Sequence, residues 1–99
     1  MSRRASIFDD LQIFALVAEK LSYTETANEL GVTTAAVSYA ITRLEKRIAV
    51  KLFNRTTRSV KITDAGVFLR DHLAEAIAQI LAAIDEAHAI DTRAKAHSD

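Results

Sequence analysis

The chain has 99 residues, of which 49% are hydrophobic, and it contains two glycines and no proline or cysteine. This composition predicts one small, mainly α-helical domain with an apolar core. The lack of cysteine excludes disulfides, cysteine-ligated zinc and thiol catalysis, and it fits a cytoplasmic location. No apolar run approaches the roughly 18 residues that span a bilayer, and the N-terminus lacks the apolar segment of a signal peptide. We therefore expect no membrane partner.

The formal net charge is zero, but the charges are divided unevenly along the chain. Residues 1–63 carry ten basic and six acidic side chains, whereas residues 64–99 carry three and seven. Residues 43–61 hold seven lysines and arginines and one acidic residue, Glu45. A local cationic patch suits contacts with phosphates whatever the total charge is. The alternative is a solvated cationic face with no partner.

Apolar residues at helical spacing predict a first helix over residues 9–20. Its main stripe includes Leu11, Phe14 and Ala18, whereas Ile13 and Leu16 lie off this stripe. A helix that is apolar on two sides is usually buried on two sides. We therefore expect one side in the domain core and the other against a second element or a second subunit.

Two further helices are predicted over residues 24–30 and 34–48. Ser22 is followed three residues later by Glu25, which is a capping-box pattern. Gly31 can end the second helix in a left-handed conformation, and Thr33 can cap the third. The core stripe of the third helix is then Val37, Ile41, Leu44 and Ile48. Residues 23–42 thus have the spacing of a helix-turn-helix.

A short hairpin follows the third helix. Residues 50–53 and 60–62 are rich in β-branched and aromatic side chains and are predicted strands. The polar, basic residues 54–59 between them are predicted to form a wing. Residues 6–63 are therefore predicted to fold as a winged helix-turn-helix of three helices and two strands.

Thr63 can cap a final helix over residues 64–90, which would be about 40 Å long. A three-helix core is too small to cover an apolar stripe of this length. We therefore interpret it as a dimerisation helix; the alternative is a helix that caps the domain and frays at its end. The polar residues 91–99 are predicted to be a disordered tail or linker. The expected dimer interface consists of Ile13, Leu16, Leu69, Leu73, Ile77, Ile80 and Ile84.

The third helix carries a polar, non-acidic face opposite its core stripe, as a helix that enters the DNA major groove does. Hydroxyl groups can bond base edges or phosphates, and small methyl groups suit the thymine methyl. Helix N-termini also attract phosphates. The DNA contacts expected from the second and third helices are Ser22, Thr24, Thr33, Thr34, Ala35, Ser38, Tyr39, Thr42 and Arg43.

Three cationic residues in or beside the wing, Arg55, Arg58 and Lys61, complete the expected DNA-binding set. An arginine on a short loop can enter a narrow minor groove, and Arg58 lies nearer the predicted tip. Two roles stay open for Arg55: holding a phosphate, or tying the wing to the third helix. For Tyr39, the alternative to a DNA contact is a partly buried surface position.

No motif favours catalysis. The three histidines, at positions 72, 88 and 97, are spaced 16 and 9 residues apart, unlike a zinc-binding pair on adjacent helical turns. The sequence has no glycine-rich phosphate loop, and Ser38 has no histidine or acid nearby in the predicted fold. We therefore expect no enzyme activity, no cofactor and no metal.

Residues 8–84 resemble the DNA-binding region of LysR-type transcriptional regulators. The motifs that carry the resemblance are LQIF at 11–14, VAE at 17–19, SYT at 22–24, AVS at 36–38, RLE at 43–45, LFNRT at 52–56 and TDAG at 63–66, with Ala27, Leu30, Val32 and Ile41 between them. The resemblance implies that the third helix enters the major groove and that the wing meets the minor groove. It also implies that the last helix pairs antiparallel with its copy, and that effectors bind a C-terminal domain.

The sequence departs from the family pattern at three places. Thr33-Thr34-Ala35 replaces a usual Ser-Gln-Pro, so a bidentate partner for adenine is lost at Thr34. Ile48-Ala49 replaces a usual Leu-Gly, which places alanine where a positive φ is often needed. The chain also stops where the effector domain would begin, as expected of a fragment or of a regulator without its own sensor.

The predicted function is specific double-stranded DNA binding and regulation of transcription as a homodimer. A winged-helix protein-interaction module that does not bind DNA is the alternative, with the acidic last helix holding a partner helix. The basic residues 43–61 favour the DNA-binding prediction.

Overall fold

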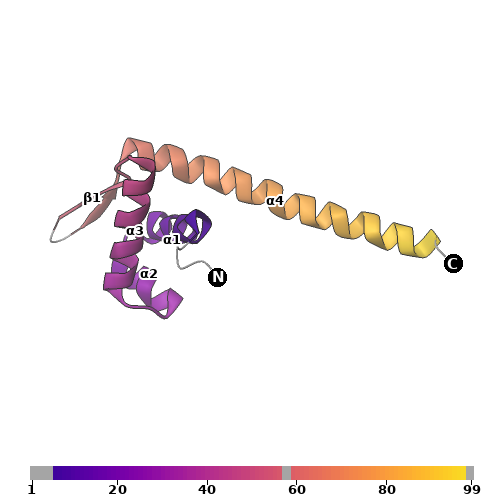
Figure 1. Cartoon of the computed structure of the whole chain (residues 1–99), viewed down its shortest axis with the longest axis horizontal. Coiled ribbons are helices and arrows are strands. Elements are labelled where there is room, and N and C mark those ends of the chain that lie inside the picture. The colour runs from indigo at the N-terminus through magenta and orange to yellow at the C-terminus, as the bar shows by residue number, and fades with distance from the viewer. Residues whose placement is uncertain (1–5, 57–58, 98–99) are drawn as a thin grey trace.

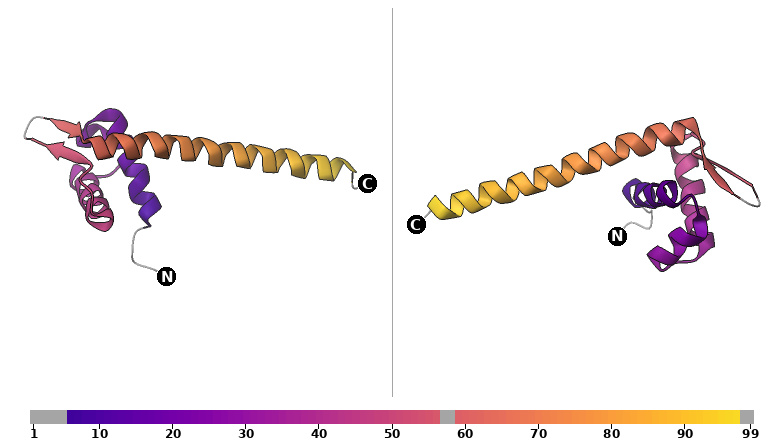
Figure 2. Two further views of the ribbon diagram at one scale, coloured as in Figure 1. Left: turned by 90° about the horizontal axis from the view of Figure 1, so that it is seen from above. Right: turned by 180° about the vertical axis from the view of Figure 1, so that it is seen from behind.

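The computed structural model describes residues 6–56 and 59–97. Its elements are α1 (Ile7–Lys20), α2 (Tyr23–Leu30), α3 (Thr34–Ile48), β1 (Phe53–Arg55), β2 (Val60–Ile62) and α4 (Asp64–His97). The first three helices form the body, the hairpin projects from one side of it, and α4 extends away on the other (Figure 1). The views in Figure 2 show the same long projection of α4, and the molecule measures 64 × 32 × 25 Å. The predicted winged helix-turn-helix with a long last helix is confirmed.

The core lies where the three helices of the body meet the base of the hairpin. The rings of Phe14 in α1 and Phe53 in β1 are 5.5 Å apart between centroids. The Tyr23 ring of α2 meets Phe53 edge-on at 6.4 Å. Such tilted aromatic pairs add to the burial of apolar area that holds small domains together. The predicted core stripe of α3 is buried at Val37, Ile41 and Leu44, and partly buried at Ile48.

Hydroxyl side chains define the helix starts, as N-caps do. The Oγ atom of Ser22 accepts the Glu25 N–H at 3.0 Å, and the Oγ1 atom of Thr33 accepts the Ala36 N–H at 3.0 Å. Both predicted caps are thus present. Helix α1 starts at residue 7 rather than 9, because Ser6 caps it by accepting a backbone N–H two residues on, at 3.0 Å.

The first strand begins later than predicted. Residues 50–53 were the predicted strand, whereas β1 spans Phe53–Arg55. The Glu45 carboxylate of α3 accepts the N–H groups of Leu52 and Phe53 at 2.7 and 3.1 Å. The chain before the hairpin is therefore bonded to α3, and antiparallel pairing starts only where Phe53 lies opposite Ile62.

Helix α4 starts close beneath the hairpin, and Gly66 permits this approach. A Cβ atom at Gly66 would lie 2.5 Å from the Leu52 carbonyl oxygen and 2.6 Å from Cγ1 of Ile62. The Oγ1 atom of Thr63 accepts the Gly66 N–H at 3.0 Å and donates to the Lys51 carbonyl at 2.7 Å. These contacts fix the first turn of α4 against the base of the wing.

Helix α4 continues beyond its predicted end at residue 90. The prediction of a disordered polar segment over residues 91–99 is wrong for residues 91–97, which are helical. No proline or glycine follows Gly66 in the sequence, so nothing local ends the helix. Ion pairs between Lys95 and Asp91, at 3.1 Å, and between Arg93 and Glu86, at 3.7 Å, lie along its last turns.

Candidate nucleic-acid interface

Helix α3 turns one face away from the core. Thr34, Ala35 and Tyr39 are exposed on it, and 65% of Tyr39 is accessible. Ser38 and Thr42 are half-buried at the edge of this face next to the hairpin. Since the face contains hydroxyl groups and no carboxylate, it is chemically suited to bases and phosphates.

Arg43, at the other edge of this face, is bound to α1. Its Nε and Nη2 atoms donate to the two carboxylate oxygens of Asp10 at 2.9 and 2.6 Å. Asp10 is fully buried, and its hydrogen bond raises the pKa of Arg43 above the usual value. The Arg43 guanidinium carbon also lies 5.1 Å from the centroid of the Tyr39 ring. Arg43 was predicted to contact DNA; in the structure its bidentate donor pair is occupied inside the protein.

Arg55 joins the wing to α3. Its Nη1 atom donates to Ser38 Oγ at 2.6 Å and its Nη2 atom to Thr42 Oγ1 at 3.2 Å. Its guanidinium carbon lies 5.1 Å from the centroid of the Tyr23 ring. We call these four residues the Arg55 cluster. Of the two roles left open for Arg55, the structure shows the tie to the third helix.

Tyr23 is a member of this cluster that sequence reasoning missed. It is 8% accessible, and its hydroxyl has no hydrogen-bond partner within the described part of the chain. Burial raises the pKa of Tyr23, while the nearby Arg55 charge opposes this rise. The phenol is therefore neutral at physiological pH, and the Arg55 guanidinium packs over its ring in a cation–π contact.

The starts of α2 and α3 face the wing across a cleft of about 510 Å³. Ser22, Thr24, Thr34 and Arg55 all line this cleft. Two helix N-termini, several hydroxyl groups and a guanidinium are thus brought together. Ser22 and Thr33 serve as helix caps as well, so their oxygens already accept a backbone N–H. The combination of helix N-termini and cations favours an anion.

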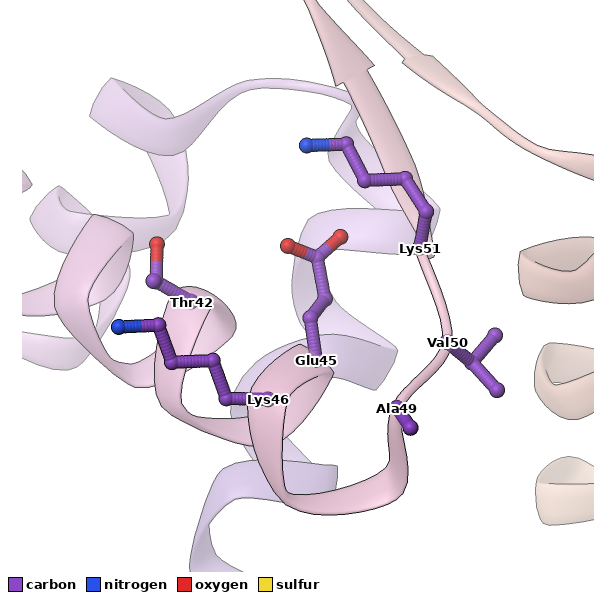
Figure 3. A pocket seen from close by; sticks show the side chains of 6 residues that line it. All are labelled: Thr42, Glu45, Lys46, Ala49, Val50 and Lys51. Carbon is purple, nitrogen blue, oxygen red and sulfur yellow. The ribbon is translucent and has the colours of Figure 1, made fainter.

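A second cationic region lies where α3 ends and the chain turns toward β1. Figure 3 shows Lys46 from α3 and Lys51 from the following segment, which extend past the carboxylate of Glu45. The hollow that they line has a volume of about 340 Å³. One carboxylate oxygen of Glu45 accepts the backbone N–H groups of Leu52 and Phe53, so this side chain holds the start of the hairpin against α3. The sequence pattern places Lys46 on the polar face of the third helix, whereas only its position in the basic stretch indicated Lys51.

The two remaining candidates belong to the wing. Lys61 is exposed on β2, opposite Asn54 of β1. Arg58 lies outside the described residues, so its role at the wing tip stays a prediction.

The candidate dimer residues fall into two groups. Ile13, Leu16, Leu69 and Leu73 are half-buried, and all but Leu16 pack against the domain core. Further along α4 the apolar residues face solvent, with accessibilities of 40% for Ile77 and 58% for Ile80 and Ile84. An apolar groove of about 220 Å³ between α1 and α4 connects the half-buried residues with the exposed ones. The groove is lined by Phe8, Leu11, Gln12, Leu73, Ala76, Ile77 and Ile80.

Over residues 6–56 and 59–97, no three histidine, aspartate or glutamate side chains are grouped closely enough to hold a metal ion. In the same ranges, no helix has the length and apolar character needed to cross a membrane.

Comparison with known proteins gives one family. Residues 8–67 match the model of the bacterial regulatory helix-turn-helix protein, lysR family. The chain is 42% identical over 77 residues to the uncharacterized HTH-type transcriptional regulator YcaN of Escherichia coli (strain K12), an alignment that covers 78% of this chain and 26% of that protein. The glycine cleavage system transcriptional activator of the same organism is 44% identical over 66 residues, covering 67% of this chain and 22% of the activator. The chain thus spans about a quarter of the length of these relatives.

Solved structures agree with the family match. The full-length structure of the Vibrio cholerae virulence activator AphB, a member of the LTTR protein family, superposes with a TM-score of 0.69 at 29% identity, over 80% of this chain and 27% of AphB. A crystal structure of the BenM DBD/catB site 1 DNA complex has the same fold, with a TM-score of 0.77 at 24% identity, over 88% of this chain and 97% of that one. With a family model matched over 60 of its 99 residues, the chain belongs to the LysR family of bacterial regulatory helix-turn-helix proteins.

Proposed function

We propose that this chain binds specific double-stranded DNA and regulates transcription. The observation that carries the proposal is the exposed face of α3, which presents hydroxyl groups and Tyr39 beside the cationic wing. Relatives over this region are transcriptional regulators, and the BenM DBD structure is a DNA complex. In our proposal α3 enters the major groove, the starts of α2 and α3 hold backbone phosphates, and the wing lies over the adjacent groove. The protein then acts in the cytoplasm, where bacterial DNA lies, and has no catalytic role.

A mobility-shift assay with bulk genomic DNA tests DNA binding. Binding should be strong at about 50 mM salt and weaker by orders of magnitude at about 200 mM, because each phosphate contact releases counterions. Lys46→Ala should lower the slope of log affinity against log salt by about one. Lys95→Ala, which removes the same charge at the far end of α4, is the matched control and should leave the slope unchanged. Absence of any shift at the lower salt would contradict the proposal.

We also propose that the protein is a homodimer joined through α4. Ile77, Ile80 and Ile84 recur at helical spacing along α4 and stay 40–58% accessible in the described part of the chain, although α1 borders Ile77 and Ile80 on one side. An apolar stripe of this kind is normally buried against another helix. A second copy of α4 would cover it and would place two copies of α3 on one DNA duplex.

The rival function, a protein-interaction module without a DNA role, would also use the exposed stripe of α4. A protein-interaction role of this kind does not require the hydroxyl groups on the exposed face of α3 or the cations beside them. The mobility-shift assay separates the two, because an interaction module retains no salt-dependent affinity for genomic DNA.

A further inference from the structure

In the Arg55 cluster, the arginine determines whether two hydroxyl groups of α3 act as hydrogen-bond donors or acceptors. An arginine side chain has only donors and stays charged, so it cannot accept a hydrogen bond. Ser38 and Thr42 must therefore be the acceptors in their contacts with Arg55, at 2.6 and 3.2 Å. The proton of each hydroxyl is then directed to some other atom.

Within a helix, such protons usually go to the carbonyl one turn earlier. Thr26 of α2 behaves in this way, since its hydroxyl donates to the Ser22 carbonyl at 2.8 Å. Neither Ser38 nor Thr42 donates a hydrogen bond to any atom of residues 6–56 or 59–97. Both hydroxyls retain a proton to donate to a partner outside the chain.

The position of the two hydroxyls indicates what that partner is. Ser38 and Thr42 are one helical turn apart, on the edge of the exposed face of α3 that adjoins the wing. The Arg55 charge lies directly beside them. A fixed positive charge beside a hydroxyl favours a proton acceptor as its partner and disfavours an amino group, which is a donor.

We propose that Arg55 fixes Ser38 and Thr42 as hydrogen-bond donors, so that this edge of α3 recognises acceptor atoms of DNA. This inference rests on the proposed function and adds the chemistry of the contact. In the major groove the favoured acceptors are N7 and O6 of guanine, a base that offers two acceptors side by side. On the backbone the same chemistry is supplied by a phosphate oxygen. Arg55 is thus a positioning residue for specificity.

Atomic substitution in the DNA tests the proposal. A preferred duplex is first selected from a random library by the wild-type protein. Each purine is then replaced by its 7-deaza analogue, which lacks the N7 acceptor, and each phosphate in turn by a methylphosphonate. Affinities are measured for the wild type, Ser38→Ala and Thr42→Val. The control is Thr92→Val, which removes an exposed hydroxyl near the far end of α4, outside the proposed DNA-binding surface.

At one or more positions, substitution should weaken wild-type binding about three- to tenfold, as the loss of one hydrogen bond does. The same substitution should cause no further loss in Ser38→Ala or in Thr42→Val, while Thr92→Val responds as the wild type does. A responding 7-deaza position assigns the contact to a base, and a responding methylphosphonate assigns it to a phosphate. Arg55→Gln, whose carbonyl can accept from the hydroxyls, should reduce this response.

Equal losses in the wild type and in both variants at every position would overturn the inference. Selection of no preferred sequence, with bulk DNA still bound, would overturn the assignment to guanine and leave the phosphate oxygen, which the methylphosphonate scan then tests on any duplex that is bound. These outcomes differ from failure of the proposed function, in which the wild type binds neither bulk nor selected DNA.

Discussion

At the scale of single residues, two arginines hold α3 at opposite edges. Arg43 is bound to the buried Asp10 of α1, and Arg55 extends from the wing to Ser38 and Thr42. The sequence predicted where the cations would gather, because a basic stretch is visible in the residue order. It did not predict the Asp10–Arg43 pair, since these residues are 33 positions apart and only packing brings them together.

Asp10→Asn should lower the free energy of unfolding by about 2–4 kcal/mol, because a charge-assisted pair with a buried partner is broken on one side. Urea unfolding with an unchanged m-value measures the effect. The double variant Asp10→Leu with Arg43→Met removes both charges and should recover most of the loss. A change below about 0.5 kcal/mol for Asp10→Asn would show that the pair has no structural role.

Tyr23→Phe should raise the free energy of unfolding by about 1 kcal/mol, because it removes a buried hydroxyl that has no partner in the described structure. Tyr39→Phe is the control. Because Tyr39 is exposed, this substitution should leave the free energy of unfolding of the protein unchanged. Thermal unfolding of the two variants side by side gives the comparison. A Tyr23→Phe variant that is less stable than the wild type would indicate that the hydroxyl is bonded in solution.

At the scale of elements, local chemistry predicted the helix starts well and the strand start poorly. Ser22, Thr33 and Thr63 each cap the helix that the sequence assigned to them. The start of β1 depends on a long-range contact instead, because Glu45 bonds the chain before the hairpin. The predicted end of α4 at residue 90 is too early, because residues 91–97 are polar but contain no helix breaker.

The turn after α3 gives an element-scale prediction. Ala49 has φ +59°, a left-handed conformation that costs a residue with a Cβ about 1–2 kcal/mol. Ala49→Gly relieves this cost but loses more chain entropy, so we expect a net gain of about 0.5–1 kcal/mol in stability. Ala36→Gly, in an exposed helical position of α3, should instead lose stability. Denaturant midpoints compare the two, and a destabilised Ala49→Gly would contradict the argument.

At the scale of the whole molecule, α4 gives the domain its length and its exposed apolar stripe. The uneven distribution of charge along the sequence predicted a basic N-terminal domain and an acidic last helix, which the zero net charge by itself does not show. In the proposed dimer the residues that cover α4 belong to a second copy, so the spacing of apolar residues in one chain does not specify which of them pair. Two α3 helices in a dimer imply a DNA site with two roughly symmetric halves.

Ile80→Lys should give monomers at micromolar concentration, because it places a charge in the centre of the proposed α4 pairing. Gln79→Lys adds the same charge one residue away, off the apolar stripe, and should stay dimeric. Sedimentation of both variants tests the assignment. A dimer that persists in Ile80→Lys would place the subunit contact elsewhere.

The proposed DNA-binding surface consists of the exposed face of α3 and the adjoining wing. Titration of the labelled protein with a DNA duplex, followed residue by residue by NMR, tests it most directly. We expect the largest changes in chemical shift at Ser38, Tyr39, Thr42, Lys46 and Arg55, and little change along the outer half of α4. Changes concentrated on α4, or no changes on α3, would show that DNA binds elsewhere or not at all.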